Sequence, residues 1–454
     1  MPDDSQAKVK QYKANRLPSF PGKTAWKEIL PERKPSPQLS GEQHADFVVV
    51  GAGFAGLSAA HRLHQIDPDA RIVVLDASCV AEGAAGRNSG FMIDLPHDIS
   101  SDSYASANTS EDQTQIRLNR SAIQFATDLA NTLKLDKSVF NACGKINGAA
   151  TPKGHQHNID YARHLAQLNE PCDLYDAAAM SEITGTSYYQ SGLFTPGTVM
   201  LQPAAFIRAI ADGLPANAQL FENSPVLELN REGSHWQVVS NAGSVSASKV
   251  ILAVNGYVES FGFFKRRLMH VFTYGSMSHA MSDAQCASLG GHEQWNLTPA
   301  DPMGVTVRRL NGIGGNRILV RSRFTYDPSM QVSKARMANV GKLHNKQFNE
   351  RFPMLKGLQM EYRWAGHLCI SRNNVHAFGE VDDNLFAACC QNGLGLSRGT
   401  MAGIAAAELA TDTSSESVDA LLSEQQPQKL PPEPFAWLGA NATMRYKEMM
   451  SGRE

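Results

Sequence analysis

The stretch FVVVGAGFAGLSAAHRLHQIDPDARIVVLD, residues 47–76, decides the fold of this chain. It opens on FVVV and closes on RIVVLD, two short apolar runs typical of strands that are buried on both faces of a parallel sheet. The segment AGLSAAHRLHQI between them is helix-like. Because strand, helix and strand follow within about thirty residues, the stretch is predicted to be a βαβ unit.

Glycines at the junction of the first strand and the helix indicate what this unit binds. Gly51, Gly53 and Gly56 have the GxGxxG spacing. The first glycine allows a tight turn, the second lets a diphosphate reach the backbone at the helix N-terminus, and the third lets the helix pack on the strand. Asp76 follows Gly56 by twenty residues, where a carboxylate can accept hydrogen bonds from ribose hydroxyls. The predicted dinucleotide-binding residues of this unit are Gly51, Gly53, Phe54, Ala55, Gly56, Asp76 and Ala77.

Length, charge and cysteine content limit the class of protein. With 454 residues, of which 42% are hydrophobic, the chain is expected to form two connected domains. Its 42 Lys and Arg against 44 Asp and Glu offer no basic field for nucleic acid or an anionic membrane, so a small-molecule ligand is favoured. The seven cysteines have no CxxC spacing, which indicates neither a disulfide framework nor a metal site. Since neither a signal peptide nor a membrane span is recognisable, a cytoplasmic location is expected.

Three further segments are features that a simple nicotinamide dehydrogenase would not explain. GAAGRNSG, at 83–90, is rich in glycine and has Arg87 as its one charged group, so its backbone bends sharply or approaches a ligand. Residues 226–257 alternate and turn like a three-stranded antiparallel meander that ends in the buried run VILAV. Residues 385–388 are predicted as a strand, followed by the loop NGLG and a helix of small residues that can lie close to a cofactor.

The rest of the chain is predicted to form a second domain that is inserted twice into the first, with an arm before and a small element after. The C-terminal element is expected to dock through Phe435, Trp437 and Leu438. The predicted boundaries are an extended arm at 1–45, a cofactor domain at 46–119, 198–262 and 364–425, a substrate domain at 120–197 and 263–363, and a docking tail at 426–454.

Together these residues resemble the D-amino acid oxidase superfamily of FAD enzymes, which includes glycine oxidase, sarcosine oxidase and γ-glutamylputrescine oxidase. GAAGRNSG resembles the family's GASGRNGG, and GLFTPGTVMLQPAAF, at 192–206, resembles its glycine-proline strand and re-entrant helix. LAVNGY, RSRFTY, WAG and NGLG follow in the family's order. The resemblance implies a mixed α/β fold: a Rossmann-like FAD-binding domain of the glutathione-reductase type with an inserted antiparallel-sheet substrate domain.

The resemblance also implies further contacts to FAD. The loop at 83–90 would run beside the isoalloxazine ring, Val226 would offer its backbone to the adenine, and NGLG would cover the pyrimidine side of the flavin. Close amine-oxidase relatives carry SGHG where this chain has NGLG, so Leu394 stands in place of a histidine whose role does not transfer. Cys389 and Cys390 are the residues to which a covalent flavin link would apply. The implied contacts are Gly86, Arg87, Asn88, Ser89, Val226, Asn392, Gly393, Leu394 and Gly395.

The reaction implied by the resemblance is oxidation of the C–N bond of an amine or amino acid. Hydride leaves the α-carbon for flavin N5, and the imine then hydrolyses in water, so no protein nucleophile is expected. A cation is expected to hold a substrate carboxylate. Arg323 is the first choice because it occupies the position of the family's GGR-type arginine, and Arg321 and Arg308 are alternatives. Alternation along LVRSRF predicts that Arg321 and Arg323 share one strand face.

Other side chains are predicted to complete the pocket wall. His270 and Tyr274, in MHVFTYG, are expected on one side of a strand where the chain re-enters the substrate domain. Trp364 is expected to wall the pocket as well. The candidate catalytic residues are therefore Arg323, His270, Tyr274 and Trp364.

Several functional hypotheses are compatible with these motifs. The leading one is an FAD-dependent amine or amino-acid oxidase or dehydrogenase, with oxygen or another electron acceptor. A γ-glutamylated or other carboxylate-bearing amine is favoured as substrate, and N-methyl, cyclic secondary and D-amino acids are alternatives. The second hypothesis is a flavin-binding partner subunit of a larger dehydrogenase without a complete substrate pocket, which Leu394 and the long arm permit. Modification of an RNA base is disfavoured by the charge balance.

Overall fold

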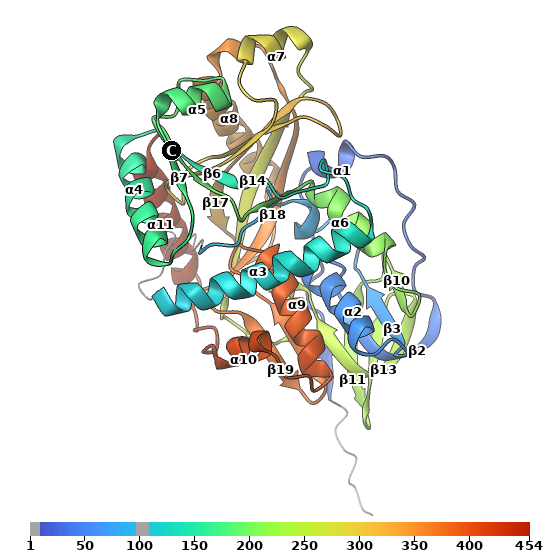
Figure 1. The fold of residues 1–454 in the computed structure, drawn as a ribbon. Coiled ribbons are helices and arrows are strands. Elements are labelled where there is room, and N and C mark those ends of the chain that lie inside the picture. Colours follow the sequence, from blue (N-terminus) through green and yellow to red (C-terminus); the bar gives the residue numbers. More distant parts are fainter. Residues whose placement is uncertain (1–9, 97–108) are drawn as a thin grey trace, which may run out of the picture.

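Two large sheets and a small one organise the chain. The computed structural model describes residues 10–96 and 109–454. Residues 1–9 of the predicted arm and residues 97–108 of the predicted cofactor domain lie outside the described residues. The first sheet has the order β1-β11-β12-β13-β2-β3-β10, with β20 paired to β13 and β19 paired to β20, and the second has the order β18-β14-β17-β16-β15-β6-β8-β7. Figure 1 shows the first sheet at the lower right, the second above it, and α3 running across the front of the molecule.

The strands have the following bounds. The first sheet contains β1 (Gln11–Lys13), β2 (Gly41–Val50), β3 (Ile72–Leu75), β10 (Ala218–Phe221), β11 (Val226–Glu232), β12 (His235–Ser240), β13 (Gly243–Leu252), β19 (Ala377–Asp382) and β20 (Leu385–Cys389). The second contains β6 (Lys145–Ala149), β7 (Asp173–Tyr175), β8 (Ser191–Thr195), β14 (Leu268–Ser278), β15 (Trp295–Pro299), β16 (Thr306–Leu310), β17 (Arg317–Tyr326) and β18 (Met360–Ser371). The small sheet contains β4 (Phe91–Met92), β5 (Phe140–Asn141) and β9 (Val199–Leu201).

The α-helices are α1 (Ala25–Glu28), α2 (Phe54–Ile66), α3 (Thr109–Thr132), α4 (Pro152–Gln167), α5 (Ala177–Thr184), α6 (Pro203–Asp212), α7 (Asp283–Leu289), α8 (Lys334–Arg351), α9 (Ser397–Ala410), α10 (Glu416–Ser423) and α11 (Phe435–Ser451). Short 3-10 helices lie at η1 (Ala84–Gly86), η2 (Asn255–Phe261) and η3 (Pro353–Leu355). Within the described ranges, no helix is both long and apolar enough to cross a membrane.

The centre of the first sheet is parallel and buried on both faces. β13 pairs in parallel with β2 and β20, and β3 pairs in parallel with β2 and β10. Val49 and Val74 pack into the core beneath α2 and α9, whereas Val48 and Val73 pack into the core beneath the antiparallel meander. Because successive side chains of a strand point to opposite faces, covering both faces requires the continuous apolar runs seen in the sequence.

Three details of the fold differ from the expectations. β2 begins at Gly41, before Asp46, because its first residues already pair with β13. The third meander strand and the run VILAV form one strand, β13, which pairs antiparallel with β12 and parallel with β2. The segment from residue 411, whose polar composition predicts a solvated linker, instead contains the helix α10, which buries Val418 and Leu421.

The C-terminal helix docks through side chains other than those expected. α11 packs on β17, where Ala436 and Met444 contact apolar side chains and Asn441 exchanges hydrogen bonds with the backbone of Tyr326. The predicted docking residues Phe435, Trp437 and Leu438 are instead 68%, 38% and 53% exposed. The prediction was wrong because the helix packs Ala436, Asn441 and Met444 against the rest of the chain and turns Phe435, Trp437 and Leu438 outward.

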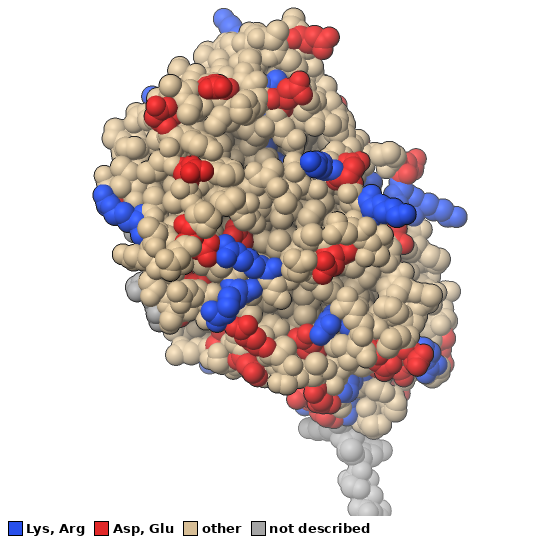
Figure 2. Space-filling model, viewed as in Figure 1, with Lys and Arg blue, Asp and Glu red and all other residues tan. Residues whose placement is uncertain are grey.

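The surface carries charges of both signs. Lys and Arg are interspersed with Asp and Glu over the face drawn in Figure 2. This mixture agrees with the formal net charge of -2.

Candidate cofactor and substrate site

The glycine-rich turn after β2 forms one wall of a long cavity, called the first cavity here. Gly51 has φ +106, and a Cβ there would lie 2.6 Å from the Ala253 carbonyl oxygen. A Cβ on Gly56 would lie 1.7 Å from the Gly51 carbonyl oxygen, so α2 reaches the turn only because this residue is glycine. Gly53 is the N-cap of α2, makes no side-chain cap hydrogen bond and lines the cavity. The turn therefore presents a helix N-terminus to the cavity, where the positive end of the helix dipole favours a phosphate.

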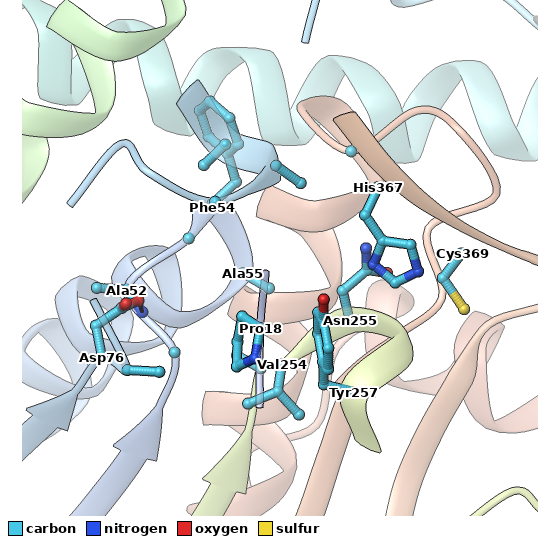
Figure 3. Close-up of a pocket in the computed structure, with 18 of the residues that line it drawn as sticks. Pro18, Ala52, Phe54, Ala55, Asp76, Val254, Asn255, Tyr257, His367 and Cys369 are labelled. Carbon is cyan, nitrogen blue, oxygen red and sulfur yellow. Dashed lines mark hydrogen bonds between the residues drawn. The ribbon is translucent and has the colours of Figure 1, made fainter. Parts of the chain in front are cut away.

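Asp76 is held in place at the end of β3. Its Oδ2 accepts a hydrogen bond from the Ala52 amide at 2.8 Å, and its Oδ1 accepts one from the Ser78 amide at 2.9 Å. Burial raises the pKa of Asp76, and the hydrogen bonds oppose that shift. The carboxyl group lines the first cavity beside the turn (Figure 3). Its position fits the ribose contact predicted from the sequence.

The loop at 83–90 is braced by its own residues. The Asn88 side chain donates to the Ala85 carbonyl at 2.7 Å and accepts from the Gly90 amide at 2.8 Å. Gly90 has φ +81, and a Cβ there would lie 2.3 Å from a terminal nitrogen of Arg308. Both the conformation and the lack of space require glycine at this position.

Arg87 ties this loop to other parts of the chain. Its guanidinium is buried and donates to the carbonyl oxygens of Glu82 at 2.6 Å and Ala365 at 3.2 Å. Burial lowers the pKa of Arg87 to about 10, and Glu82 partly opposes that shift. The residue is a buried crosslink on the wall of the cavity and not a solvated surface arginine.

The predicted cofactor residues fall into three groups: those that line the first cavity, those that line a neighbouring cavity, and described residues that line neither. Those that line the first cavity are Gly51, Gly53, Phe54, Ala55, Asp76, Ala77, Arg87, Asn88, Val226, Gly393 and Gly395. Ser89 and Leu394 line a neighbouring cavity, called the second cavity here. Asn392 lies behind the wall, where its side chain accepts from the Ser371 amide at 2.8 Å and donates to the Val375 carbonyl at 2.9 Å. Gly56 and Gly86 are not among the described residues that line either cavity, and backbone atoms fill their Cβ positions.

The second cavity lies between the loop at 83–90 and the second sheet. It shares lining residues with the first cavity, among them Arg87, Asn88 and Gly393, so the two cavities adjoin each other at the loop. Its other lining residues come mainly from the second sheet and the small sheet: Phe91, Thr273, Tyr274, Gly275, Thr298, Pro299, Thr306, Leu319, Arg321 and Trp364. Leu394 packs with Phe91 and Ile93 and gives this cavity an apolar wall.

Tyr274 and Trp364 line the second cavity. The Trp364 Nε1 donates to the Arg87 carbonyl at 2.9 Å, which joins β18 to the loop at 83–90. The Tyr274 hydroxyl lies 2.7 Å from the Thr325 hydroxyl. Burial raises the pKa of Tyr274, so this phenol is neutral at pH 7.

Arg323 lies outside both cavities. Residue 323 has φ +68, and the pairing of β14 with β17 steps from Thr273↔Phe324 to Tyr274↔Ser322, so Arg323 is the extra residue of a β-bulge. The bulge breaks the alternation, so that Arg321 lines the second cavity while Arg323 pairs with Glu448 of α11 at 2.6 Å. The predicted shared face of the two arginines is therefore absent.

His270 also lies outside both cavities, but it contacts a histidine that the sequence reasoning missed. His270 Nε2 lies 2.8 Å from Glu259 Oε2, and its Nδ1 lies 3.3 Å from His367 Nε2. His367 lines the first cavity beside Tyr257 (Figure 3). The only signal for it was its place directly after WAG in β18. Burial holds the pKa of His367 well below its usual range, so its ring is neutral.

The cysteine that lines the first cavity is Cys369, and not Cys389 or Cys390, which the resemblance suggested. Cys389 and Cys390 are buried in the core beneath the meander and are not among the described residues that line the cavity. Burial raises the pKa of Cys389 to about 12, so its thiol is protonated. Cys369 of β18 does line the cavity.

A glycine-turn cavity that adjoins a second cavity against a mostly antiparallel sheet is the arrangement expected of a flavin-dependent oxidoreductase. Residues 46–409 match the family model described as DAO, FAD dependent oxidoreductase, and the chain belongs to this family. The family resemblance, the mixed α/β fold and the FAD cofactor predicted from the sequence are thereby confirmed. The turn at 51–56, the fixed Asp76 and the glycine-rich loop fit FAD. The protein is an FAD-dependent amine or amino-acid oxidoreductase.

Known proteins resemble the chain over most of its length. A probable oxidoreductase OrdL of Haemophilus influenzae is 24% identical over 386 residues, 82% of this chain and 84% of that protein. The γ-glutamylputrescine oxidoreductase of Escherichia coli is 25% identical over 390 residues, 80% and 83% of the two chains. Among solved structures, glycine oxidase from Geobacillus kaustophilus superposes with a TM-score of 0.67 at 16% identity, covering 82% of this chain and 96% of that one. This last likeness concerns the fold.

Proposed function

We propose that this protein oxidises the C–N bond of an amine or amino acid that carries a separate anionic group, and that the second cavity binds this substrate. The observation that supports the proposal is a set of cations around that cavity, of which Arg321 is half-buried and the other two are buried. Arg321 lines it, and Arg308 and Lys145 lie directly behind its wall. Among the described residues that line it, none is Asp or Glu.

Arg308 contacts the wall of the second cavity by donating hydrogen bonds to backbone carbonyl oxygens. Its guanidinium donates to the carbonyl oxygens of Ser89 at 2.6 Å and Leu201 at 2.9 Å, and to Asn296 Oδ1 at 2.9 Å. These partners are neutral oxygens, so they solvate the guanidinium without cancelling its charge. Burial lowers the pKa of Arg308 to about 9, and Cys143 partly opposes that shift.

Lys145 is buried behind Thr298, which lines the second cavity. Its ammonium group donates to Asn147 Oδ1 and lies 3.4 Å from the Thr298 hydroxyl. Burial lowers the pKa of Lys145 to about 8, and Asp94 partly opposes that shift. Asp94 itself pairs with Arg120 at 3.0 Å. A buried ammonium is costly without a counter-ion. The positive potential that Lys145, Arg308 and Arg321 create in the second cavity therefore favours an anionic ligand there.

Arg321 is the proposed contact for the anionic group, in place of Arg323. A guanidinium on the cavity wall can hold a carboxylate by two parallel hydrogen bonds. Arg323 is engaged by Glu448 on the far side of the bulge. The likeness to the γ-glutamylputrescine oxidoreductase of E. coli, at 25% identity, supports a γ-glutamylated amine, whose carboxylate is distant from the reacting nitrogen.

The remaining side chains position the substrate and exclude water. Trp364, Phe91 and Leu394 provide apolar surface beside the loop at 83–90, where the two cavities meet. When bound, FAD would supply the hydride acceptor for oxidation of the carbon that carries the nitrogen. Exclusion of water favours the neutral amine over its ammonium form and strengthens the attraction between Arg321 and the substrate anion.

The test compares two arginines on one strand. Purified protein is mixed anaerobically with γ-glutamylated amines, sarcosine, pipecolate and D-amino acids, and with the methyl esters of the same compounds, while the oxidised-flavin absorbance is followed. We expect bleaching by an anionic substrate and much weaker bleaching by its ester. Arg321→Met should weaken substrate binding by roughly 10- to 150-fold, the effect of losing a charge-assisted hydrogen bond of about 1.5–3 kcal/mol. Arg323→Met, the matched control, should bind substrate as the wild type does.

Three outcomes would contradict the proposal. Equal bleaching by an acid and its ester would show that the anionic group is not recognised. Loss of substrate binding in Arg323→Met, with normal binding in Arg321→Met, would show that Arg323, the first choice from the sequence, binds the anionic group. A flavin that no substrate bleaches, but that an added reduced partner protein reduces, would support the alternative of an electron-transferring partner subunit.

A further inference from the structure

The N-terminal arm forms one side of the first cavity. Six of its residues line that cavity: Ala14, Arg16, Leu17, Pro18, Ser19 and Phe20. Figure 3 shows Pro18 beside Ala55, Val254 and Tyr257. The family model begins at residue 46, so this wall lies outside the part of the chain that the family describes.

One end of the arm is anchored to the meander. β1 pairs antiparallel with β11, from Gln11↔Asn230 to Lys13↔Glu228. The Tyr12 hydroxyl donates to Asp382 Oδ2 at 2.6 Å. Beyond the strand, the Ala14 amide donates to the Leu227 carbonyl at 2.8 Å. This anchor lies at the meander edge of the cavity, next to Val226.

The other end is anchored to the loop at 83–90. The Arg87 guanidinium donates to the carbonyl oxygens of Pro21 and Gly22, each at 3.0 Å. The Trp26 Nε1 donates to the Asn88 carbonyl at 2.8 Å. The Thr24 hydroxyl donates to the Gly86 carbonyl at 3.2 Å. The second anchor therefore consists of the loop that borders both cavities.

Between the anchors the arm spans the cavity with few contacts. The Asn15 amide donates to the Ser260 carbonyl at 3.2 Å, the Arg16 guanidinium donates to the Pro328 carbonyl at 2.7 Å, and the Ser19 amide donates weakly to the Tyr257 hydroxyl at 3.4 Å. Leu17 is 45% exposed. A segment held at its ends and lightly held between them can lift from the cavity without disrupting either sheet.

We propose that residues 14–22 are a strap that closes over bound FAD and forms part of the cofactor site. The ligand is the flavin dinucleotide that the family binds, so the proposal does not depend on the substrate. Arg87 fixes the strap at the loop, and the cofactor enters and leaves only after the strap has been released. The strap should therefore slow FAD release and protect the arm from proteases when FAD is bound.

The first experiment replaces Gly22 by alanine. Gly22 has φ +79, and a Cβ there would lie 2.2 Å from the Arg363 carbonyl oxygen, so the strap cannot seat on β18. Gly41→Ala is the matched control, because Gly41 has φ +69 with no atom within 4 Å of its Cβ position. FAD release from the holoprotein is followed by the rise in flavin fluorescence. We expect release at least about tenfold faster in Gly22→Ala than in the control.

The second experiment uses the wild-type protein and needs no variant. Limited trypsin digestion with and without saturating FAD is followed by mass spectrometry of the fragment that begins at Leu17. We expect FAD to slow cleavage after Arg16 at least about tenfold, because cleavage requires the strap to open. Equal cleavage rates in the two states would overturn the proposal, as would equal FAD release from Gly22→Ala and Gly41→Ala.

Discussion

Replacing Lys145 by methionine should make the protein more stable at pH 7 while weakening its binding of an anionic substrate. Methionine has a similar unbranched shape and carries no charge. Asn147 Oδ1 would keep the hydrogen bond that it accepts from the Thr298 hydroxyl at 2.7 Å, so no buried acceptor would lose its partner. The substitution therefore removes the buried charge and little else.

The magnitude follows from the pKa of Lys145. Burial lowers that pKa from 10.5 to about 8. Between these pH values the unfolded chain carries a proton that the folded chain lacks, so the free energy of unfolding rises with pH across this window. At 1.36 kcal/mol per pKa unit, the free energy of unfolding of the wild-type protein rises by about 3 kcal/mol between pH 8 and pH 10.5. Below pH 8 the full cost of the buried ammonium is present.

The assay is urea unfolding of both proteins at saturating FAD, from pH 7 to pH 10. We expect Lys145→Met to exceed the wild type by about 3 kcal/mol at pH 7, with the difference shrinking as the pH rises above 8. Lys153→Met on α4 is the control, because the Lys153 side chain is 51% exposed. A variant less stable than the wild type at pH 7 would refute the reasoning, since it would mean that the Lys145 charge is already compensated inside the protein.

Two further substitutions test the cofactor side of the site. Asp76→Ala should weaken FAD binding by about tenfold or more, measured by fluorescence titration, because it removes the carboxylate that the Ala52 amide holds at the turn. An unchanged dissociation constant would exclude Asp76 from the cofactor site. Gly90→Ala should lower the free energy of unfolding by more than about 2 kcal/mol, because the new Cβ would meet Arg308 at 2.3 Å in a left-handed backbone. Gly233→Ala, with φ +61 and open space around its Cβ position, is the control, and similar losses in both variants would contradict the expected clash.

The sequence by itself determined the elements that local sterics impose. GxGxxG predicts the turn because Gly51 must adopt a positive φ and Gly56 must let α2 approach the backbone, and both requirements arise within six residues. The apolar runs predict buried parallel strands because a strand covered on both faces exposes no polar side. The family motifs then supplied the cofactor and the reaction class.

Tertiary structure decided which side chains face the cavities. Alternation predicted that Arg321 and Arg323 would share a strand face. Pairing with β14 instead places a bulge at Arg323. Glu448 of α11, a helix far away in the sequence, forms an ion pair with that arginine. Lys145 and His367 reach the site from strands whose sequences gave little indication of it. The direction in which a side chain points depends on the register of partner strands far away in the chain, which a local pattern does not encode.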